Sequence, residues 1–205
     1  MGLLTDSREY GILVNAVEAA AHLDPKALSC EIGLREGGGT KHMIDAMWQS
    51  GQYGRTHIAI DPYGNIEYKS AEGLVTRHDY TNTMRNRCMM ELHEYLHTQY
   101  NDQINVLVFV LEDAEFFKRY ADGVPIYWHS KRIANQYAVV HFDGPHAHAP
   151  LVEGVEFFTP RLVQGAHVVF DDIANYDHDK LERKLFEMGY SPVDKGAYKA
   201  SYKYR

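Results

Sequence analysis

Five apolar runs of strand length recur along this 205-residue chain, and a helical segment separates each run from the next. Strands that alternate with helices are typical of a mostly parallel sheet. A near-continuous β-branched run is typical of a strand that helices cover on both faces. The predicted strands are residues 28–32, 56–60, 104–111, 137–142 and 166–170. This alternation predicts the α/β class, with a parallel sheet between two layers of helices.

The last residues of the chain break this alternation. Residues 189–193 and 197–204 predict two strands joined by a tight turn. In the second strand, tyrosine and alanine alternate strictly with polar residues, beginning with Tyr198 and Lys199. Such alternation predicts a strand with one face toward solvent, and it assigns Lys199 to that face. Five parallel strands and this hairpin make seven strands in all.

Helices are predicted between the strands, at residues 7–22, 40–50, 83–100, 113–121, 150–162 and 178–188. Asp6 and Glu9 are spaced as a capping box at the start of the first helix. The stretch 62–103 is longer than a simple crossover requires, so we expect it to hold an inserted helix over the site. The chain contains no repeat, low-complexity run or flexible linker, so residues 1–205 are expected to form one domain.

Charge and composition argue against several classes of partner. The net charge is −7, and an acidic surface repels phosphate backbones, so duplex nucleic acid is not an expected partner. No run approaches the roughly 18 apolar residues of a membrane span, and the start does not resemble a signal peptide. Cys30 and Cys88 lie in no paired motif, which is typical of reduced thiols. We expect a cytoplasmic protein without membrane contact, and a homo-oligomer is compatible with these features.

A glycine-rich segment follows the first predicted strand, in the order Glu31-Ile32-Gly33-Leu34-Arg35-Glu36-Gly37-Gly38-Gly39. Ligands of open α/β sheets bind at the carboxyl ends of the strands, and glycine lets the backbone approach a ligand closely. In a dinucleotide fingerprint, the middle glycine exposes the backbone to pyrophosphate. Arg35 stands at that position here, which favours a ligand without pyrophosphate over NAD or FAD.

The second predicted strand ends at Asp61. A carboxylate at this place can accept hydrogen bonds from both hydroxyls of a ribose. Each feature alone is weak evidence, because an aspartate before proline often only opens a turn. Together, at two successive strand ends, the glycine loop and Asp61 predict a ribose-containing ligand.

Three more carboxylates follow the last two parallel strands. Asp143 comes after the fourth strand, and Asp171 and Asp172 come after the fifth. Since these strands are expected to be neighbours, the three should converge, and like charges that close resist joint ionisation unless something neutralises them. A divalent cation such as Mg²⁺, which prefers oxygen ligands, is the simplest answer. The alternative is that these aspartates only cap turns and helices.

These motifs resemble those of class I methyltransferases, and most closely the family-24 group. The resemblance rests on ExGxxxGG after the first strand, an acidic end to the second, DGxH at residues 143–146 and FDD at residues 170–172, and it extends from residue 28 to the terminal hairpin. It implies a Rossmann-like, seven-stranded fold. It also implies that S-adenosylmethionine binds at Glu31, Gly33, Gly37, Gly38, Asp61 and Asp113.

The resemblance extends to metal-dependent O-methyltransferases of the catechol and sugar types. Asp171 follows Asp143 by 28 residues, the spacing of the metal aspartates in catechol-type enzymes. Asp172 departs from the amide of those enzymes and matches the sugar type. The resemblance implies methylation of a small hydroxylated molecule, a sugar or a phenol, with Mg²⁺ or another divalent cation at Asp143, Asp171 and Asp172.

His146 is the expected general base, because it lies three residues beyond Asp143 in a loop that should face the pocket. Histidine has an unperturbed pKa of about 6.5, so a good fraction is neutral and able to accept a proton near pH 7. His148 is a rival for this role, and a solvated loop histidine without a role is the third interpretation.

Two other functions stay open at this stage. His93, Glu94 and His97 form a literal HExxH, the pattern of a zinc-dependent hydrolase, although no clear third ligand follows. A five-residue pattern in which only three residues are specified also arises by chance in a chain with 12 histidines. The other function is a non-catalytic module that binds S-adenosylmethionine without turnover.

Overall fold

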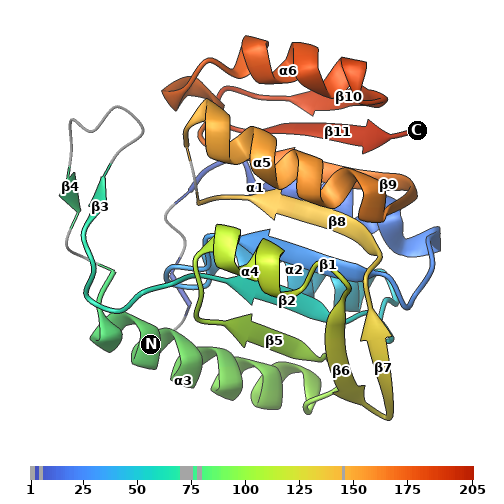
Figure 1. The fold of residues 1–205 in the computed structure, drawn as a ribbon. Coiled ribbons are helices and arrows are strands. Elements are labelled where there is room, and N and C mark those ends of the chain that lie inside the picture. Colours follow the sequence, from blue (N-terminus) through green and yellow to red (C-terminus); the bar gives the residue numbers. More distant parts are fainter. Residues whose placement is uncertain (1–2, 5–6, 70–75, 78–79, 145) are drawn as a thin grey trace.

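The computed structural model describes residues 3–4, 7–69, 76–77, 80–144 and 146–205. Its central sheet has the strand order β10-β11-β9-β8-β1-β2-β5 (Figure 1). The five strands from β9 to β5 pair in parallel, and β11 runs antiparallel to both of its neighbours, so β10 runs in the same direction as those five. The strands are β1 (Leu28–Ile32), β2 (His57–Ile60), β5 (Val106–Phe109), β8 (Tyr137–Phe142), β9 (Leu162–Phe170), β10 (Tyr190–Lys195) and β11 (Ala200–Tyr204). The predicted α/β class and the Rossmann-like, seven-stranded sheet are confirmed.

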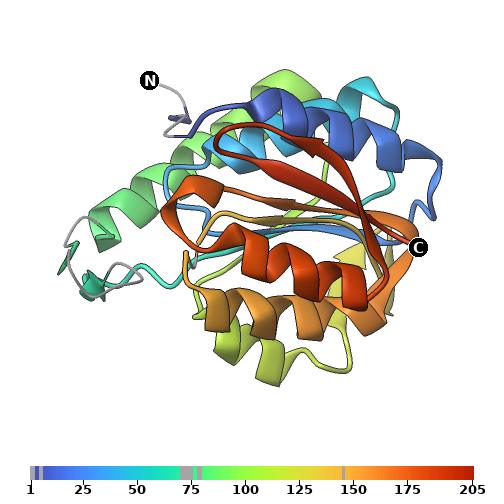
Figure 2. The same cartoon turned by 90° about the horizontal axis from the view of Figure 1, so that it is seen from above.

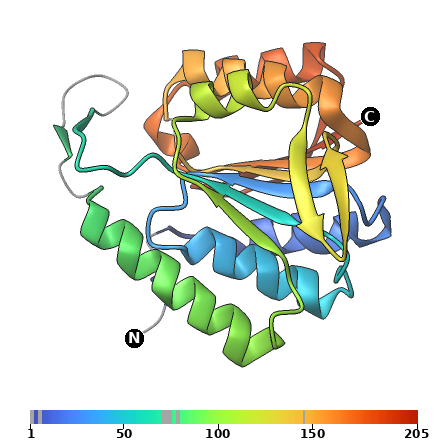
Figure 3. The same cartoon turned by 60° about the horizontal axis from the view of Figure 1, so that its bottom comes forward.

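Helices cover both faces of this sheet (Figures 2 and 3). One layer holds α1 (Tyr10–Ala19), α2 (Gly38–Gln49) and α3 (Asn82–Tyr100). The other holds α4 (Asp113–Arg119), α5 (His148–Phe158) and α6 (His178–Glu187). Each layer buries its own apolar cluster, with Leu13 and Met43 in the first and Phe142 and Phe158 in the second. Burial on both faces explains the continuous apolar strand sequences.

One hairpin, formed by β6 (Val124–Trp128) and β7 (Ser130–Ala134), is not predicted by the sequence pattern. Pro125 lies inside β6, and a proline within an apolar run argues against a strand because it donates no ladder hydrogen bond. The two-stranded ribbon tolerates it because β6 pairs on one side only. A second short pair, β3 (Tyr68–Lys69) with β4 (Thr76–Arg77), lies in the 62–103 stretch that also holds α3. Three short 3₁₀ helices complete the fold at Ala20–His22, Thr159–Arg161 and Ile173–Asn175.

Of the capping box predicted for the first helix, Glu9 makes no side-chain cap hydrogen bond. Glu9 stands before α1 with a left-handed φ of 57°, and Asp6 lies outside the described residues. The Glu9 carboxylate instead accepts hydrogen bonds from the backbone amides of Ala197, Tyr198 and Lys199, at 2.9, 2.8 and 3.0 Å. These three donors lower the pKa of Glu9. Glu9 thus ties the start of the chain to the turn of the terminal hairpin.

Two smaller expectations concern thiols and membranes. Cys30 and Cys88 are both buried, free thiols. None of the described helices is long and apolar enough to cross a membrane.

Candidate active site

The glycine loop between β1 and α2 touches the loop that follows β8. Gly33 has a φ of +95°, and a Cβ atom there would lie 2.3 Å from the carbonyl oxygen of Asp143. The Asp143 amide donates to the Ile32 carbonyl oxygen at 2.8 Å. Gly37, with a φ of 86°, caps the N-terminus of α2, which begins at Gly38. The ends of β1 and β8 therefore form one continuous edge.

Asp61, at the end of β2, organises this loop. Its carboxylate accepts hydrogen bonds from the amides of Arg35 at 2.9 Å and Tyr63 at 3.1 Å, one on each oxygen. The side chain is only 2% exposed, and burial raises its pKa to about 6. A carboxylate oxygen has two acceptor positions, so both oxygens keep capacity for a further donor.

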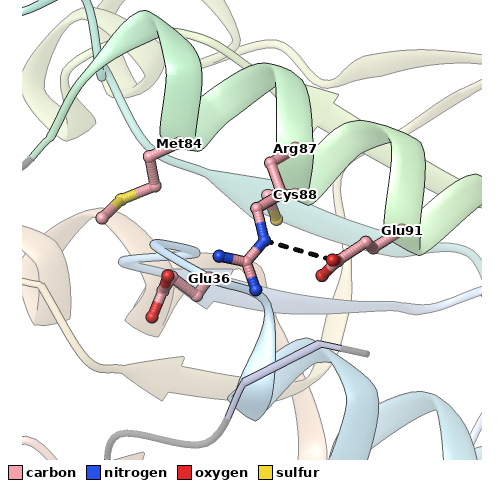
Figure 4. Close-up of a pocket in the computed structure, with 5 residues that line it drawn as sticks. All are labelled: Glu36, Met84, Arg87, Cys88 and Glu91. Atoms are coloured by element: carbon pink, nitrogen blue, oxygen red, sulfur yellow. Dashed lines mark hydrogen bonds and ion pairs between the residues drawn. The ribbon is translucent and has the colours of Figure 1, made fainter. Parts of the chain in front are cut away.

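Tyr63 and helix α3 form a wall beside the glycine loop. The Tyr63 hydroxyl donates to the Arg35 carbonyl oxygen at 2.6 Å, and a Cβ on Gly37 would lie 3.3 Å from the Cys88 sulfur of α3. Between Glu36 of the loop and α3 lies a shallow recess, in which Arg87 pairs with Glu91 at 3.1 Å (Figure 4). Met84 and Cys88 complete its lining.

Asp113 is the first residue of α4, after β5, which is the neighbour of β2. Its side chain is half-buried and accepts a hydrogen bond from the Ala114 amide at 2.8 Å. Burial raises its pKa. Glu112 before it is exposed. The structure thus brings Gly33, Asp61 and Asp113 to the same edge of the sheet, at successive strand ends.

Glu31 occupies the interior of the protein and is fully buried. One carboxylate oxygen accepts from the Thr40 hydroxyl at 2.5 Å, and the other pairs with His141 Nδ1 at 2.9 Å. A Cβ on Gly39 would lie 1.8 Å from the Glu31 carboxylate, so this third glycine is required for the packing of Glu31. Sequence reasoning assigned no such role to Gly39.

Two buried histidines extend the Glu31 contacts into a polar chain that sequence reasoning missed. His57 Nε2 lies 2.9 Å from the Thr40 hydroxyl, and its Nδ1 lies 3.0 Å from the Ser29 hydroxyl. Burial lowers the pKa of His57 to about 4 and also lowers that of His141, so both rings are neutral near pH 7. One signal in the sequence could have revealed these contacts: a histidine inside an otherwise apolar strand must find a polar partner when it is buried.

Lys199 connects this series of buried polar side chains to the aspartates. The sequence prediction that Lys199 faces solvent is wrong, since the side chain is fully buried. Its ammonium group lies 2.6 Å from Asp171 Oδ2, 2.9 Å from the Ser7 hydroxyl and 3.4 Å from His141 Nε2. The reason is that α1 packs against β11 and covers the face that the alternating pattern assigned to water.

Asp143 and Asp171 form a carboxyl pair at the ends of β8 and β9. Burial and the charge of Asp171 raise the pKa of Asp143 well above its ordinary value. Burial alone would raise the pKa of Asp171 too, but the hydrogen bond with Asp143 and the charge of Lys199 outweigh it and lower this pKa to about 2. Ser7 also donates to Asp171. The surroundings of the two carboxyls therefore shift their pKa values in opposite directions.

Asp172 points its carboxylate elsewhere. Its Oδ2 lies 3.4 Å from His146 Nδ1, and the two side chains are 35% and 27% exposed. Its backbone amide donates to Asp171 at 2.8 Å. His148 begins α5, and its Nδ1 has no hydrogen-bond partner among the described residues. The partly exposed His146–Asp172 pair lies directly beside the buried Asp171 and the half-buried Asp143.

The HExxH motif lies on the outer surface of α3. His93, Glu94 and His97 are all exposed, and His97 pairs with Asp102 at 2.9 Å. His93 is therefore a surface residue of α3. Within the described part of the chain, the one group of three or more His, Cys, Asp or Glu side chains that lie close enough to share a metal is Glu31, His141 and Asp143, and it contains no residue of this motif.

Comparisons with known proteins agree with this architecture. Residues 30–173 match the family described as "Methyltransferase domain". A search of curated protein sequences finds no match. Among solved structures, the calicheamicin methyltransferase CalS11 is 11% identical with a TM-score of 0.65, over 93% of this chain and 77% of that one.

Two further solved structures have the same fold. The O-methyltransferase NovP is 15% identical with a TM-score of 0.62, over 94% of this chain and 77% of that one. An O-methyltransferase from Bacillus cereus, solved in complex with SAH, is 10% identical with a TM-score of 0.52, over 98% and 83%. At these identities the likeness shows the fold, while the family match covers the glycine loop, Asp61 and all three aspartates. The chain therefore belongs to this methyltransferase family and is a class I, S-adenosylmethionine-dependent methyltransferase.

Proposed function

We propose that the chain transfers the methyl group of S-adenosylmethionine to a hydroxyl of a small molecule, a sugar or a phenol. The observation that carries the proposal is the partly exposed His146–Asp172 pair next to the junction of the Gly33 loop with Asp143. A proton acceptor thus stands at the strand edge where the cofactor binds. Two structural neighbours are O-methyltransferases, which supports oxygen as the acceptor atom.

The proposed cofactor residues line successive strand ends. The glycines Gly33, Gly37 and Gly38 allow close approach of the loop, and Asp61 accepts from the ribose hydroxyls through its remaining lone pairs. Asp113 lies one strand further along, at the proposed adenine end. Glu31 acts from the interior, where it holds the loop by its contact with Thr40.

His146 is the proposed general base. When bound, S-adenosylmethionine supplies an electrophilic methyl group. The Asp172 carboxylate next to Nδ1 favours a proton on that nitrogen, which leaves Nε2, an atom that is buried in this structure, as the basic one. His146 then takes the hydroxyl proton as the oxygen–carbon bond forms and the sulfur–carbon bond breaks.

The sequence also predicted a divalent cation, but the side chains, in the positions that they occupy in this structure, do not fit one. Asp171 already binds the Lys199 ammonium at 2.6 Å, and Asp172 faces His146 instead of the other two aspartates. Burial and the nearby charge of Asp171 raise the pKa of Asp143. We therefore assign no step of the reaction to a metal.

Cofactor binding tests the proposal first, and turnover tests it second. Calorimetry is expected to show S-adenosylmethionine and SAH binding with micromolar affinity and NAD producing no heat. A panel of sugars and phenols, assayed for methylated product, is then expected to yield an O-methylated compound. Absence of heat at millimolar cofactor would overturn the assignment of the loop. Binding without turnover on any hydroxyl, amine or thiol would favour the non-catalytic module.

The raised pKa of Asp61 predicts that cofactor affinity rises with pH. Only the ionised carboxylate offers full acceptor capacity to the ribose, and Asp61 loses its proton as the pH rises through about 6. Affinity should weaken roughly tenfold for each pH unit below this pKa and level off above it. In the free protein the sign is opposite, because a raised carboxyl pKa contributes stability at low pH that is lost as the pH rises. Calorimetry between pH 5 and pH 8 measures the first effect.

The Asp61→Asn variant is the matched control for this titration. It keeps a side-chain acceptor but cannot ionise, so its affinity should be lower and flat with pH. An equally steep pH dependence in the variant would mean that another group, and not Asp61, controls binding.

A further inference from the structure

The buried ammonium of Lys199 has all of its hydrogen-bonding capacity in use. An ammonium carries three N–H donors, and the acceptors here are the Asp171 carboxylate, the Ser7 hydroxyl and His141 Nε2. Its charge also lies 5.1 Å from the centre of the Tyr10 ring. A buried charge is tolerated when it is paired and hydrogen-bonded, and Lys199 meets both conditions.

Lys199 offsets the charge of an aspartate without any additional ion. Its ammonium group lies 2.6 Å from Asp171 Oδ2, and both side chains are buried. The reason to expect a metal was the repulsion between converging carboxylates, and the positive charge of Lys199 already relieves it.

The other candidate cation group is also filled by protein contacts. Single atoms of Glu31, His141 and Asp143 lie within 4.8 Å of one another. His141, however, uses Nδ1 toward Glu31 at 2.9 Å and Nε2 toward Lys199 at 3.4 Å. A dication at this point would stand beside the Lys199 ammonium inside the protein, where repulsion between like charges is strong.

We propose that Lys199 is the cation that neutralises the acidic corner formed by Asp143, Asp171 and Asp172, and that it takes the place that a divalent metal holds in related enzymes. Lys199 is a positioning residue: it holds Asp171, whose backbone neighbour Asp172 faces His146. The inference rests on the proposed function, because the corner adjoins the proposed base. It follows that His146 takes the proton of the substrate hydroxyl without a metal ion bound to that hydroxyl.

Titration with Mn²⁺, followed by electron paramagnetic resonance, tests this inference without any need for turnover. The wild-type protein is expected to bind no Mn²⁺ at millimolar concentration, and its Tm should not change with a chelator. Wild-type binding of one Mn²⁺ that disappears in Asp171→Asn would overturn the inference. That result would leave the proposed methyl transfer intact, whereas failure to bind S-adenosylmethionine would overturn the function and not the cation assignment.

Lys199→Ala and Lys199→Met separate charge from space. Both remove the ammonium, but only alanine leaves room for an ion, so only Lys199→Ala is expected to gain Mn²⁺ binding and a rise in Tm with Mn²⁺. Added Mn²⁺ or Mg²⁺ should also restore turnover in that variant. A folded Lys199→Ala that gains no Mn²⁺ binding would contradict the inference. If both variants fail to fold, the wild-type titration alone decides it.

Discussion

Turnover of a suitable acceptor is expected to fall about 100-fold or more in a His146→Ala variant, the typical scale of general-base assistance. A neutral hydroxyl is a poor nucleophile, and His146 is the proposed group that removes its proton as the new bond forms. The Asp172 carboxylate, 3.4 Å from Nδ1, orients the ring for this role. Single-turnover kinetics at saturating S-adenosylmethionine measure the chemical step directly.

His148→Ala is the matched control for His146→Ala. His148 lies two residues away at the start of α5, where burial lowers its pKa and keeps it neutral. We expect a small effect on turnover, with cofactor affinity unchanged in both variants. Equal effects in the two variants would return His146 to an ordinary loop residue, and a large loss confined to His148→Ala would exchange the roles.

Gly33→Ala is expected to destabilise the protein by about 3 kcal/mol or more, since it adds left-handed strain and forces backbone apart in a packed region. Gly33 has a φ of +95°, and an added Cβ would lie 2.3 Å from the Asp143 carbonyl oxygen and 2.7 Å from the Gly144 amide nitrogen. Neither contact is with a flexible side chain, so the loops after β1 and β8 must separate. Cofactor binding should be lost with them. Urea unfolding measures the free-energy change.

Gly51→Ala isolates the effect of the clash. Gly51 also has a positive φ, +75°, but a Cβ there would meet nothing within 4 Å. Only the backbone strain remains, so the cost should be about 1–2 kcal/mol and cofactor affinity should not change. Similar losses in the two variants would mean that the contact between the Gly33 loop and Asp143 contributes little.

The sequence predicted the sheet well where burial alone defines a strand. β1 and β8 lie at the predicted residues, because both are apolar throughout and buried on both faces. β9 was predicted to begin at residue 166 but begins at Leu162. Gly165, with a φ of +86°, interrupts the apolar pattern inside the strand, and pairing with β8 continues across it after a shift in register. Pairing between strands is a tertiary property that local pattern does not report.

What the sequence by itself determined is the edge of the sheet at which the candidate site residues gather. In a parallel sheet the carboxyl ends of all strands lie on one side, so any residue that follows a strand is placed there whatever the strand order. The positions of Gly33, Asp61, Asp143 and Asp171 along the chain were therefore sufficient to bring them to one edge.

The tertiary structure alone decided which partners those residues meet. Lys199 reads as a solvent-facing residue of an alternating strand, yet it lies 2.6 Å from Asp171 because β11 inserts beside β9 and α1 covers that face. An alternating pattern states that two faces differ, but not which helix will cover one of them. Ser7, from the other end of the chain, completes the same cluster. Contacts between residues so distant in sequence depend on the packing of whole elements, and this is why a lysine was found where the sequence predicted a metal.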